Sequence, residues 1–188
     1  MGSQSVSIAF RTATAEDIPL LLPLIKGAYR GDASRTGWTT EADLVADDRI
    51  DAAGLLAKIS DPNGAVLVAT DTSSGSFISC CEVLHKAEEG STTAYFGLFA
   101  VDPLLQGGGI GKTVLAYAEA FAREKWGVQR MEMTVIWTRA ELIAWYGRRG
   151  YFKTGERREF PYAELVNGQA LRDDLWFETL EKDLTASA

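Results

Sequence analysis

The sequence is poor in the residues that carry metal and thiol chemistry. Its 188 residues include two cysteines and one histidine. Cys80 and Cys81 are adjacent within an apolar run, and neighbours in an extended strand point to opposite faces, so these two cannot easily bridge each other. We therefore expect two buried, reduced thiols. No Cys/His spacing typical of a metal site is present, and His85 alone cannot build one, so we expect no metal.

Long apolar runs and excess positive charge are also lacking. No stretch approaches the roughly 20 apolar residues that cross a bilayer, so we expect no membrane partner. The first residues show no basic region followed by a hydrophobic segment, which predicts a cytosolic (cytoplasmic) location. A formal net charge of −7 argues against a nucleic-acid partner. With 46% apolar and 24% charged residues, the chain predicts one globular domain over residues 1–188, with its core at about 6–182.

The order of hydrophobic patterns predicts a mixed α/β domain with six or seven mostly antiparallel strands. Short connectors predict that the three central strands form hairpins. Between residues 40 and 60 we expect short helical pieces, and residues 31–40 are expected to form a loop. The predicted strands are 6–11, 65–70, 77–86, 93–101, 130–137, 151–160 and 175–182, and the predicted helices are 15–29, one opening after the glycines at 107–111, and 139–149.

A glycine-rich stretch, QGGGIGKT at residues 106–113, precedes a strongly amphipathic helix. One interpretation is a tight turn followed by a solvated Lys112. The favoured one is an anion site, because bare main-chain N–H groups at a helix N-terminus bind phosphates. The apolar stripe of that helix comprises Ile110, Val114, Leu115, Ala118, Phe121 and Ala122.

Two familiar nucleotide motifs do not fit this stretch. A P-loop of the form G-x-x-x-x-G-K-[ST] ending at Lys112 and Thr113 requires glycine at position 106, where Gln106 stands. A dinucleotide fingerprint starting at Gly107 or Gly109 requires its last glycine at position 112 or 114, and neither is glycine. The sequence therefore predicts an extended anion such as a pyrophosphate, without ATP or dinucleotide chemistry.

With its flanks, this stretch resembles the acetyl-CoA signature of the GNAT superfamily of N-acetyltransferases. The pattern [QR]-x-x-G-x-[GA] is matched by Gln106, Gly109 and Gly111. A second family hallmark, a tyrosine four residues before a Gly-aromatic pair, is matched by Tyr146 and by the pair at 150–151. The resemblance covers residues 6 to about 182, and it implies a splayed sheet and acetyl transfer from acetyl-CoA, the co-substrate, to an amine.

The resemblance also implies which residues bind coenzyme A. The pyrophosphate is expected on the main chain of the glycine loop, and the pantetheine arm on the exposed edge of the preceding strand. Gly97 suits a bulge that separates this strand from its neighbour. Many family members carry Asn seven residues before the tyrosine, where it contacts coenzyme A, whereas this chain has Arg139. The interpretation of Arg139 is a contact with a phosphate or with the pantetheine arm instead, and here the chain departs from the family pattern. The implied coenzyme A residues are Phe99, Ala100, Val101, Gln106, Gly107, Gly108, Gly109, Ile110, Gly111, Lys112, Thr113, Arg139 and Tyr146.

Acetyl transfer to an amine requires an acid that protonates the leaving thiolate. It also requires a general base or a water chain that deprotonates the ammonium, because the amine attacks as the free base. Spacing alone does not decide whether Tyr146 is a core residue or a catalytic residue. The family resemblance implies the catalytic role. Glu82 is the first choice of base, with Glu132 and His85 as weaker ones, although each has an ordinary polar role as an alternative. The aromatic candidates for the acceptor pocket are Trp38, Phe160 and Tyr162.

The sequence thus predicts an N-acetyltransferase in which a primary amine, on a small molecule or a peptide, attacks directly in a ternary complex. The alternative is a non-catalytic acyl-CoA-binding or sensing module of the same fold. An ATP-dependent enzyme is a third hypothesis and is not favoured. A homodimer is expected only because two-fold dimers are the commonest assemblies of soluble proteins.

Overall fold

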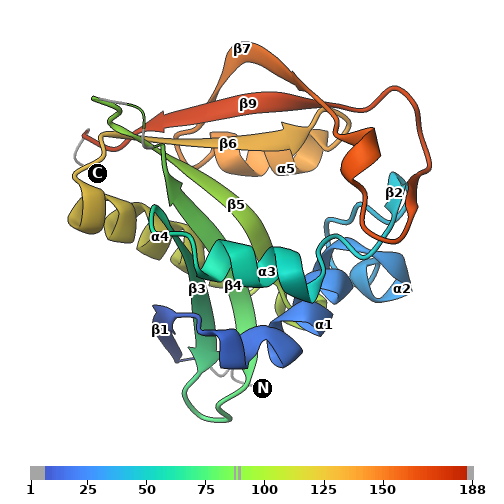
Figure 1. The fold of residues 1–188 in the computed structure, drawn as a ribbon, viewed down its shortest axis with the longest axis horizontal. Helices are drawn as coiled ribbons and strands as arrows, with labels where there is room; N and C mark the ends of the chain where they lie inside the picture. The colour runs from blue at the N-terminus through green and yellow to red at the C-terminus, as the bar shows by residue number, and fades with distance from the viewer. Residues whose placement is uncertain (1–6, 87, 89, 186–188) are drawn as a thin grey trace.

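Seven strands form one mixed sheet at the centre of the protein (Figure 1). The computed structural model describes residues 7–86, 88 and 90–185. Across the sheet the order is β1-β3-β4-β5-β6-β9-β7, and every neighbouring pair is antiparallel except β5 and β6. The predicted fold class and the three antiparallel central strands are confirmed. The strands are β1 (Ile8–Thr12), β3 (Gly64–Asp71), β4 (Phe77–His85), β5 (Thr93–Val101), β6 (Arg130–Ile136), β7 (Phe152–Glu159) and β9 (Trp176–Asp183).

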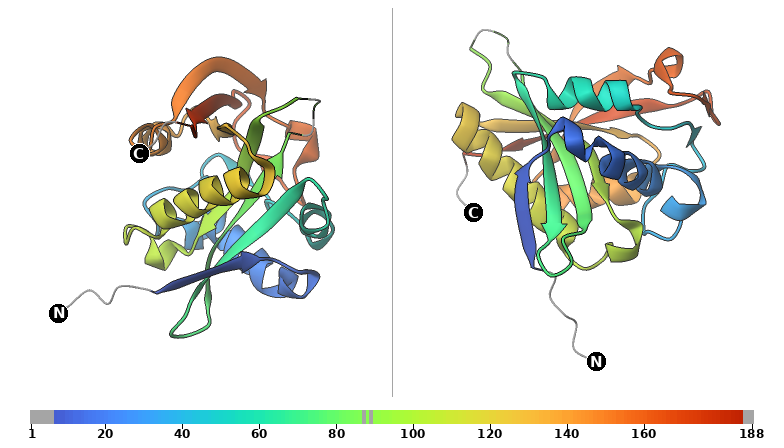
Figure 2. Two further views of the ribbon diagram at one scale, coloured as in Figure 1. Left: turned by 90° about the vertical axis from the view of Figure 1, so that its left-hand side faces the viewer. Right: turned by 60° about the horizontal axis from the view of Figure 1, so that its bottom comes forward.

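Helices cover both faces of this sheet. On one face lie α1 (Ile18–Tyr29) and α3 (Ala52–Ile59), and on the other lie α4 (Ile110–Trp126) and α5 (Ala140–Gly147). Figure 2 shows α3 and α4 on opposite sides of the strands. The apolar stripe predicted for α4 is confirmed, because all its members are buried except Phe121, which is half-buried against the same core.

The two cysteines show that β4 is buried on both faces of the sheet. Cys80 packs into the core under α1 and α3, whereas Cys81 packs into the core under α4. Both are free and fully buried, as the sequence predicts. Burial raises the pKa of the Cys80 thiol to about 12, so this sulfur is an inert apolar group at neutral pH.

The parallel strands β5 and β6 pair only at one end. Their register runs from Thr93–Arg130 to Tyr95–Glu132, and beyond it the strands diverge, as Figure 1 shows. A bulge interrupts the pairing of β5 with β4 next to the point of divergence. The predicted bulge position is therefore right, but the left-handed backbone belongs to Leu98, with φ 46°, and not to Gly97. The divergence opens a V-shaped gap in the middle of the sheet.

Gly97 is required for a different reason: there is no space for a side chain at this position. A Cβ atom at this position would stand 2.7 Å from Cε1 of Tyr95, whose hydroxyl bonds to Thr134 across the gap at 2.9 Å. We expect Gly97→Ala to lower the free energy of unfolding by about 2 kcal/mol, because the Tyr95 ring must move. Urea denaturation measures this. In a Tyr95→Ala background the same change should cost much less, and an equal cost in both backgrounds would contradict the steric explanation.

Several short elements were not predicted. Residues 31–40, expected as a loop, contain the one-turn helix α2 (Gly31–Ser34), and a second, two-stranded sheet pairs β2 (Val45–Ala46) with β8 (Gln169–Ala170). The expected helix 15–29 begins as the 3-10 turn η1 (Ala15–Asp17), and further 3-10 turns are η2 (Pro103–Leu105) and η3 (Tyr162–Glu164). Val6, placed in the first predicted strand, lies outside the described residues. No helix within the described ranges is long and apolar enough to span a membrane.

Candidate active site

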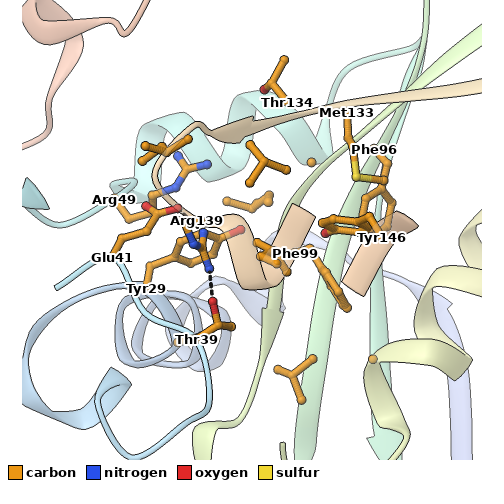
Figure 3. A pocket seen from close by; sticks show the side chains of 18 of the residues that line it. Tyr29, Thr39, Glu41, Arg49, Phe96, Phe99, Met133, Thr134, Arg139 and Tyr146 are labelled. Atoms are coloured by element: carbon orange, nitrogen blue, oxygen red, sulfur yellow. Dashed lines mark hydrogen bonds and ion pairs between the residues drawn. The ribbon is translucent and has the colours of Figure 1, made fainter. Parts of the chain in front are cut away.

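A cavity of about 620 Å³ occupies the gap between β5 and β6. Its walls come from these two strands, from the glycine loop, from α5, and from segments at 28–49 and 160–165. Figure 3 shows that its two ends differ: Glu41, Arg49 and Arg139 lie at one, and Met133 and Tyr146 at the other. The diverging strands thus create a site with a charged end and an apolar end.

The glycine loop opens onto this cavity with a set of free main-chain donors. Gly107 and Gly109 both have φ of 85°, the left-handed conformation that glycine adopts at no steric cost, and Gly109 is the N-cap of α4. The N–H groups of residues 107–112 donate to no acceptor in the described part of the chain. A helix dipole and unpaired N–H groups together suit an anion. The loop therefore has the features of an anion site, and its contact with a pyrophosphate stays a prediction.

Gln106 does not present its side chain to a ligand. Its Oε1 accepts from the N–H of Trp38 at 3.1 Å, and its Nε2 donates to the carbonyl of Val101 at 3.2 Å. The amide occupies the space that a Cβ atom at Gly37 would need. The motif glutamine therefore ties the end of β5 to the segment at 38.

The exposed edge of β5 is narrower than the sequence predicted. The Val101 carbonyl faces away from β4, towards Gln106, and by strand alternation the main chain of Phe99 faces the same way. The carbonyl of Ala100 accepts from Ser79 Oγ of β4 at 2.7 Å, so it faces the sheet. Phe99 and Val101 line the cavity and Ala100 does not. Ala100 is thus a core residue between two edge residues.

Tyr146, on α5, lies at the apolar end of the cavity. Its ring is buried against Trp145 and Tyr151, with centroids 5.0 Å and 5.7 Å away. Its hydroxyl forms no hydrogen bond with any described residue, and Figure 3 shows it directed into the cavity. Burial raises the pKa of Tyr146, an effect that the nearby Arg139 only partly offsets. The phenol is therefore protonated at neutral pH and available to donate to a ligand.

The charged end is organised by a buried ion network. Arg30 pairs with both Glu41 and Asp47, and Arg139, the N-cap of α5, donates to Glu41 and to Thr39. Burial would raise the pKa of Glu41, but the guanidinium groups of Arg139 and Arg30 outweigh it and lower that pKa. Each terminal nitrogen of the Arg139 guanidinium thus already has a protein partner, whereas its buried Nε has none among the described residues. The contact of Arg139 with a phosphate or with the pantetheine arm stays a prediction.

Glu41→Gln should leave two buried guanidinium groups short of a counter-charge. We expect the free energy of unfolding to fall by about 3 kcal/mol near neutral pH. Because the folded-state pKa of Glu41 is lowered, this stabilisation is present above its unfolded pKa and is lost as the pH falls through the folded value, so the difference from wild type should shrink below about pH 4. Urea denaturation across pH checks both points. Glu124→Gln, at an exposed site on α4, is the control, and an equal loss in both variants would contradict the network's role.

The three candidate bases lie outside the lining of the cavity. Both carboxylate oxygens of Glu82 accept from Lys58 Nζ, at 2.8 and 2.9 Å, and Oε2 of Glu82 would be 3.4 Å from a Cβ at Gly97. Lys58 and Gly97 do line the cavity, so Glu82 stands directly behind its wall. Glu132 pairs with two cations, and the His85 ring stacks on an aromatic ring of α4. Of the three, Glu82 remains the candidate nearest the cavity.

The structure brings two of the three aromatic acceptor candidates into the cavity. Trp38, 44% exposed, and Phe160, buried, both line it. Tyr162 does not: its hydroxyl accepts from the N–H of Leu175 at 2.7 Å, beside a separate shallow hollow. Tyr162 therefore anchors the loop after β7, which corrects the prediction that placed it with the acceptor.

Several lining residues carried no signal in the sequence. They lie in segments whose sequence pattern indicates only a helix end, a loop or a strand, and they belong to no shared motif. A cationic residue shortly after a loop, such as Arg49, becomes notable only when the fold places it inside the cavity. The unpredicted lining residues include Tyr29, Glu41, Arg49, Tyr95 and Trp145.

A sheet that splits beside a glycine loop, with a tyrosine facing the gap, defines a class of acyl-group transferases, and comparison with known proteins identifies the family. Residues 29–151 match the model of the acetyltransferase (GNAT) family, so the chain belongs to that family. No curated protein sequence matches the chain.

Solved structures similar to this one include several N-acetyltransferases. A spermidine N-acetyltransferase chimera from Vibrio cholerae and hSSAT is 14% identical with a TM-score of 0.67, covering 95% of this chain and 96% of that one. A ribosomal-protein-alanine N-acetyltransferase from Brucella melitensis is 22% identical with a TM-score of 0.65, at 93% and 99% coverage. An IAA acetyltransferase from Bacillus cereus is 20% identical with a TM-score of 0.62, at 94% and 99% coverage. At these identities the similarity concerns the fold.

Proposed function

We propose that this protein transfers an acetyl group from acetyl-CoA to a primary amine by direct attack in a ternary complex. The observation that carries the proposal is the cavity itself, in which unpaired N–H groups at the start of α4, the free edge of β5 and the Tyr146 hydroxyl meet. The acceptors named for the similar structures differ from one another, including spermidine and a ribosomal-protein alanine, so they do not select one here.

Acetyl-CoA would supply an activated acyl group on a thioester. Its pyrophosphate would lie on the N–H groups of residues 107–112, with the ammonium of Lys112 beside it in the first turn of α4. The amides of its pantetheine arm would pair with the main chain of Phe99 on the free edge of β5. The role of Arg139 would then be indirect, holding Glu41 and Thr39 at the charged end of the same cavity.

Tyr146 would hold a proton where the leaving sulfur departs. A thiolate has a pKa of about 8.5, below that of a buried phenol, so complete proton transfer from Tyr146 is unfavourable. The hydroxyl therefore acts mainly by donating a hydrogen bond to developing negative charge. Because the Tyr146 hydroxyl has no hydrogen-bond partner among the described residues, this donor is free for the purpose.

Glu82 would accept the proton of the attacking amine through a water molecule or through Lys58. We expect Glu82→Gln to lower kcat/KM about 30-fold near pH 7, below the span of a base in direct contact, because Lys58 already holds both carboxylate oxygens. The loss should fade as the pH approaches about 10, where the amine is already neutral. Initial rates across pH measure this, and a loss independent of pH would remove Glu82 from proton transfer.

The proposal is tested by mixing protein and acetyl-CoA with a panel of primary amines and following release of free thiol. The expected result is amine-dependent thiol release with a mass gain of one acetyl group on the acceptor. Tight acetyl-CoA binding without acetylation of any amine, small or peptide, would instead identify a non-catalytic sensing module. Absence of acetyl-CoA binding would contradict both.

A further inference from the structure

Within the described part of the chain, Arg49 is a cationic residue at the charged end of the cavity that forms no ion pair. Its side chain is half-buried and lines the cavity, and its guanidinium lies over the ring of Tyr29 at 5.0 Å from the centroid. The neighbouring carboxylates of Glu41 and Asp47 pair with Arg30 and Arg139, and no described carboxylate forms an ion pair with Arg49. Figure 3 shows the Arg49 side chain reaching into the cavity. Burial would lower the pKa of Arg49, but the nearby charges, those of Glu41 and Asp47 among them, outweigh it and raise that pKa, so the group is charged. Its guanidinium donors form no ion pair with a described residue and are therefore available to a ligand with a negative charge.

The backbone at Arg49 is held in a strained conformation. Its φ is 66°, in the left-handed region that costs roughly 1–2 kcal/mol for a residue with a side chain. Asp47 fixes this geometry, because its Oδ1 accepts from the N–H of Arg49 at 3.0 Å. Strain of this kind persists where the surroundings impose it, and it collects at ligand sites. The fold thus aims the side chain of Arg49 at the cavity at an energetic cost.

The cavity wall carries an excess of positive charge, whereas the whole chain is negatively charged. Six cationic and three anionic side chains line the cavity, whereas the chain carries a formal net charge of −7. Lys112 lies in the first turn of α4 and Arg149 in the turn after α5, but Arg49 lies at the charged end, with Glu41. Of the anionic lining residues, Glu41 and Asp47 are already neutralised by arginine. A polyamine would add positive charge at this end, whereas an anion would balance it.

We propose that the acceptor is a small amine that also carries a carboxylate, and that Arg49 binds this carboxylate. The inference rests on the proposed acetyl transfer and names the class of its acceptor. A guanidinium matches a carboxylate with two parallel hydrogen bonds, which fixes orientation as well as adding affinity. With its carboxylate on Arg49, such a molecule lies in the same cavity as Tyr146 and the edge of β5, where its amine is acetylated.

The test compares each acid with the same amine lacking its carboxylate. Leucine, phenylalanine and 4-aminobutyrate are paired with 3-methylbutylamine, 2-phenylethylamine and propylamine, which spans two spacings between amine and carboxylate. We expect kcat/KM for at least one acid to exceed that of its partner by on the order of 10- to 100-fold, the worth of a charge-assisted bidentate contact. 3-Aminopropylphosphonate distinguishes a carboxylate site from a general anion site, and it should be the poorer substrate.

Substitution of Arg49 assigns the preference to this residue. Asn tolerates the left-handed backbone, so Arg49→Asn should reduce the ratio of kcat/KM between acid and plain amine to near one, and Arg49→Lys should give an intermediate ratio. Arg35→Gln, at a surface arginine paired with Asp43, should keep the ratio of the wild type. The melting temperature and calorimetric titration with acetyl-CoA check that each variant is folded. The comparison of acids with plain amines in the wild-type protein depends on no variant.

Three outcomes would overturn the inference while leaving acetyl transfer intact. These are equal rates for acids and plain amines, a preference that survives in Arg49→Asn, and faster turnover of the phosphonate than of the matched carboxylate. Failure to bind acetyl-CoA, or to acetylate any amine of either kind, would instead overturn the proposed function and the inference with it.

Discussion

Replacing Tyr146 with phenylalanine is expected to lower kcat by about 100-fold, the lower end of the range for losing one hydrogen-bond donor to developing negative charge. The hydroxyl has no partner among the described residues, so its loss removes a contact made to the reacting group and little else. The ring stays packed on Trp145 and Tyr151. Acetyl-CoA affinity and melting temperature should therefore change little. Steady-state kinetics with calorimetry separates these effects.

Tyr151 provides the matched control for this substitution. It follows α5 five residues after Tyr146, is also buried, and donates its hydroxyl to Glu119 at 2.9 Å, away from the cavity. Tyr151→Phe should lower stability by about 1 kcal/mol through loss of that hydrogen bond, and should leave kcat near the wild-type value. Equal turnover by Tyr146→Phe and wild type would exclude Tyr146 from the chemistry, and equal damage by both variants would indicate a packing effect.

Gly109→Val is expected to weaken acetyl-CoA binding by about 100-fold or more. Valine is strongly disfavoured at φ 85°, so the loop must change its backbone to accept it, and the N–H groups at the start of α4 then lose their common direction. Each charge-assisted hydrogen bond lost from the pyrophosphate is worth about 1.5–3 kcal/mol, so two such losses already exceed a hundredfold. Calorimetric titration with acetyl-CoA measures the change.

Gly75 controls for the strain that this change introduces. It lies in the hairpin between β3 and β4 with φ of 72°, and like Gly109 it has open space where a Cβ would stand. Gly75→Val should lose comparable stability but keep the acetyl-CoA affinity of the wild type. If Gly75→Val weakened binding as much as Gly109→Val, the effect of the loop would be one of global destabilisation.

The sequence predicts the sheet and its helices well because their burial follows simple periods. The apolar stripe of α4 and the opposite burial of Cys80 and Cys81 depend only on the geometry of one element. The pairing of β2 with β8 does not, because it joins two-residue segments more than 120 positions apart that have no pattern of their own. Similarly, glycine is the usual residue for a left-handed position, but here packing imposes that conformation on Leu98.

The candidate site likewise has one part that local sequence patterns predict and another part that depends on non-local contacts. The glycine loop and Tyr146 belong to local motifs whose spacing is visible in the chain. The charged end is non-local: Glu41 meets Arg139 across 98 positions, and Arg49 becomes notable because nearby carboxylates are used by other arginines. Which of several charged residues form ion pairs depends on tertiary distances that no periodicity encodes. The charged end of the cavity could therefore be identified only from the structure.

The central claim is that free N–H groups at the start of α4 bind acetyl-CoA, and amide NMR tests it most directly. Titration of the 15N-labelled protein with acetyl-CoA should shift the amide signals of residues 107–112 along one saturable curve, with calorimetry giving one site and the same affinity. Unmoved signals from this loop at saturating acetyl-CoA, or a titration without heat, would contradict the account.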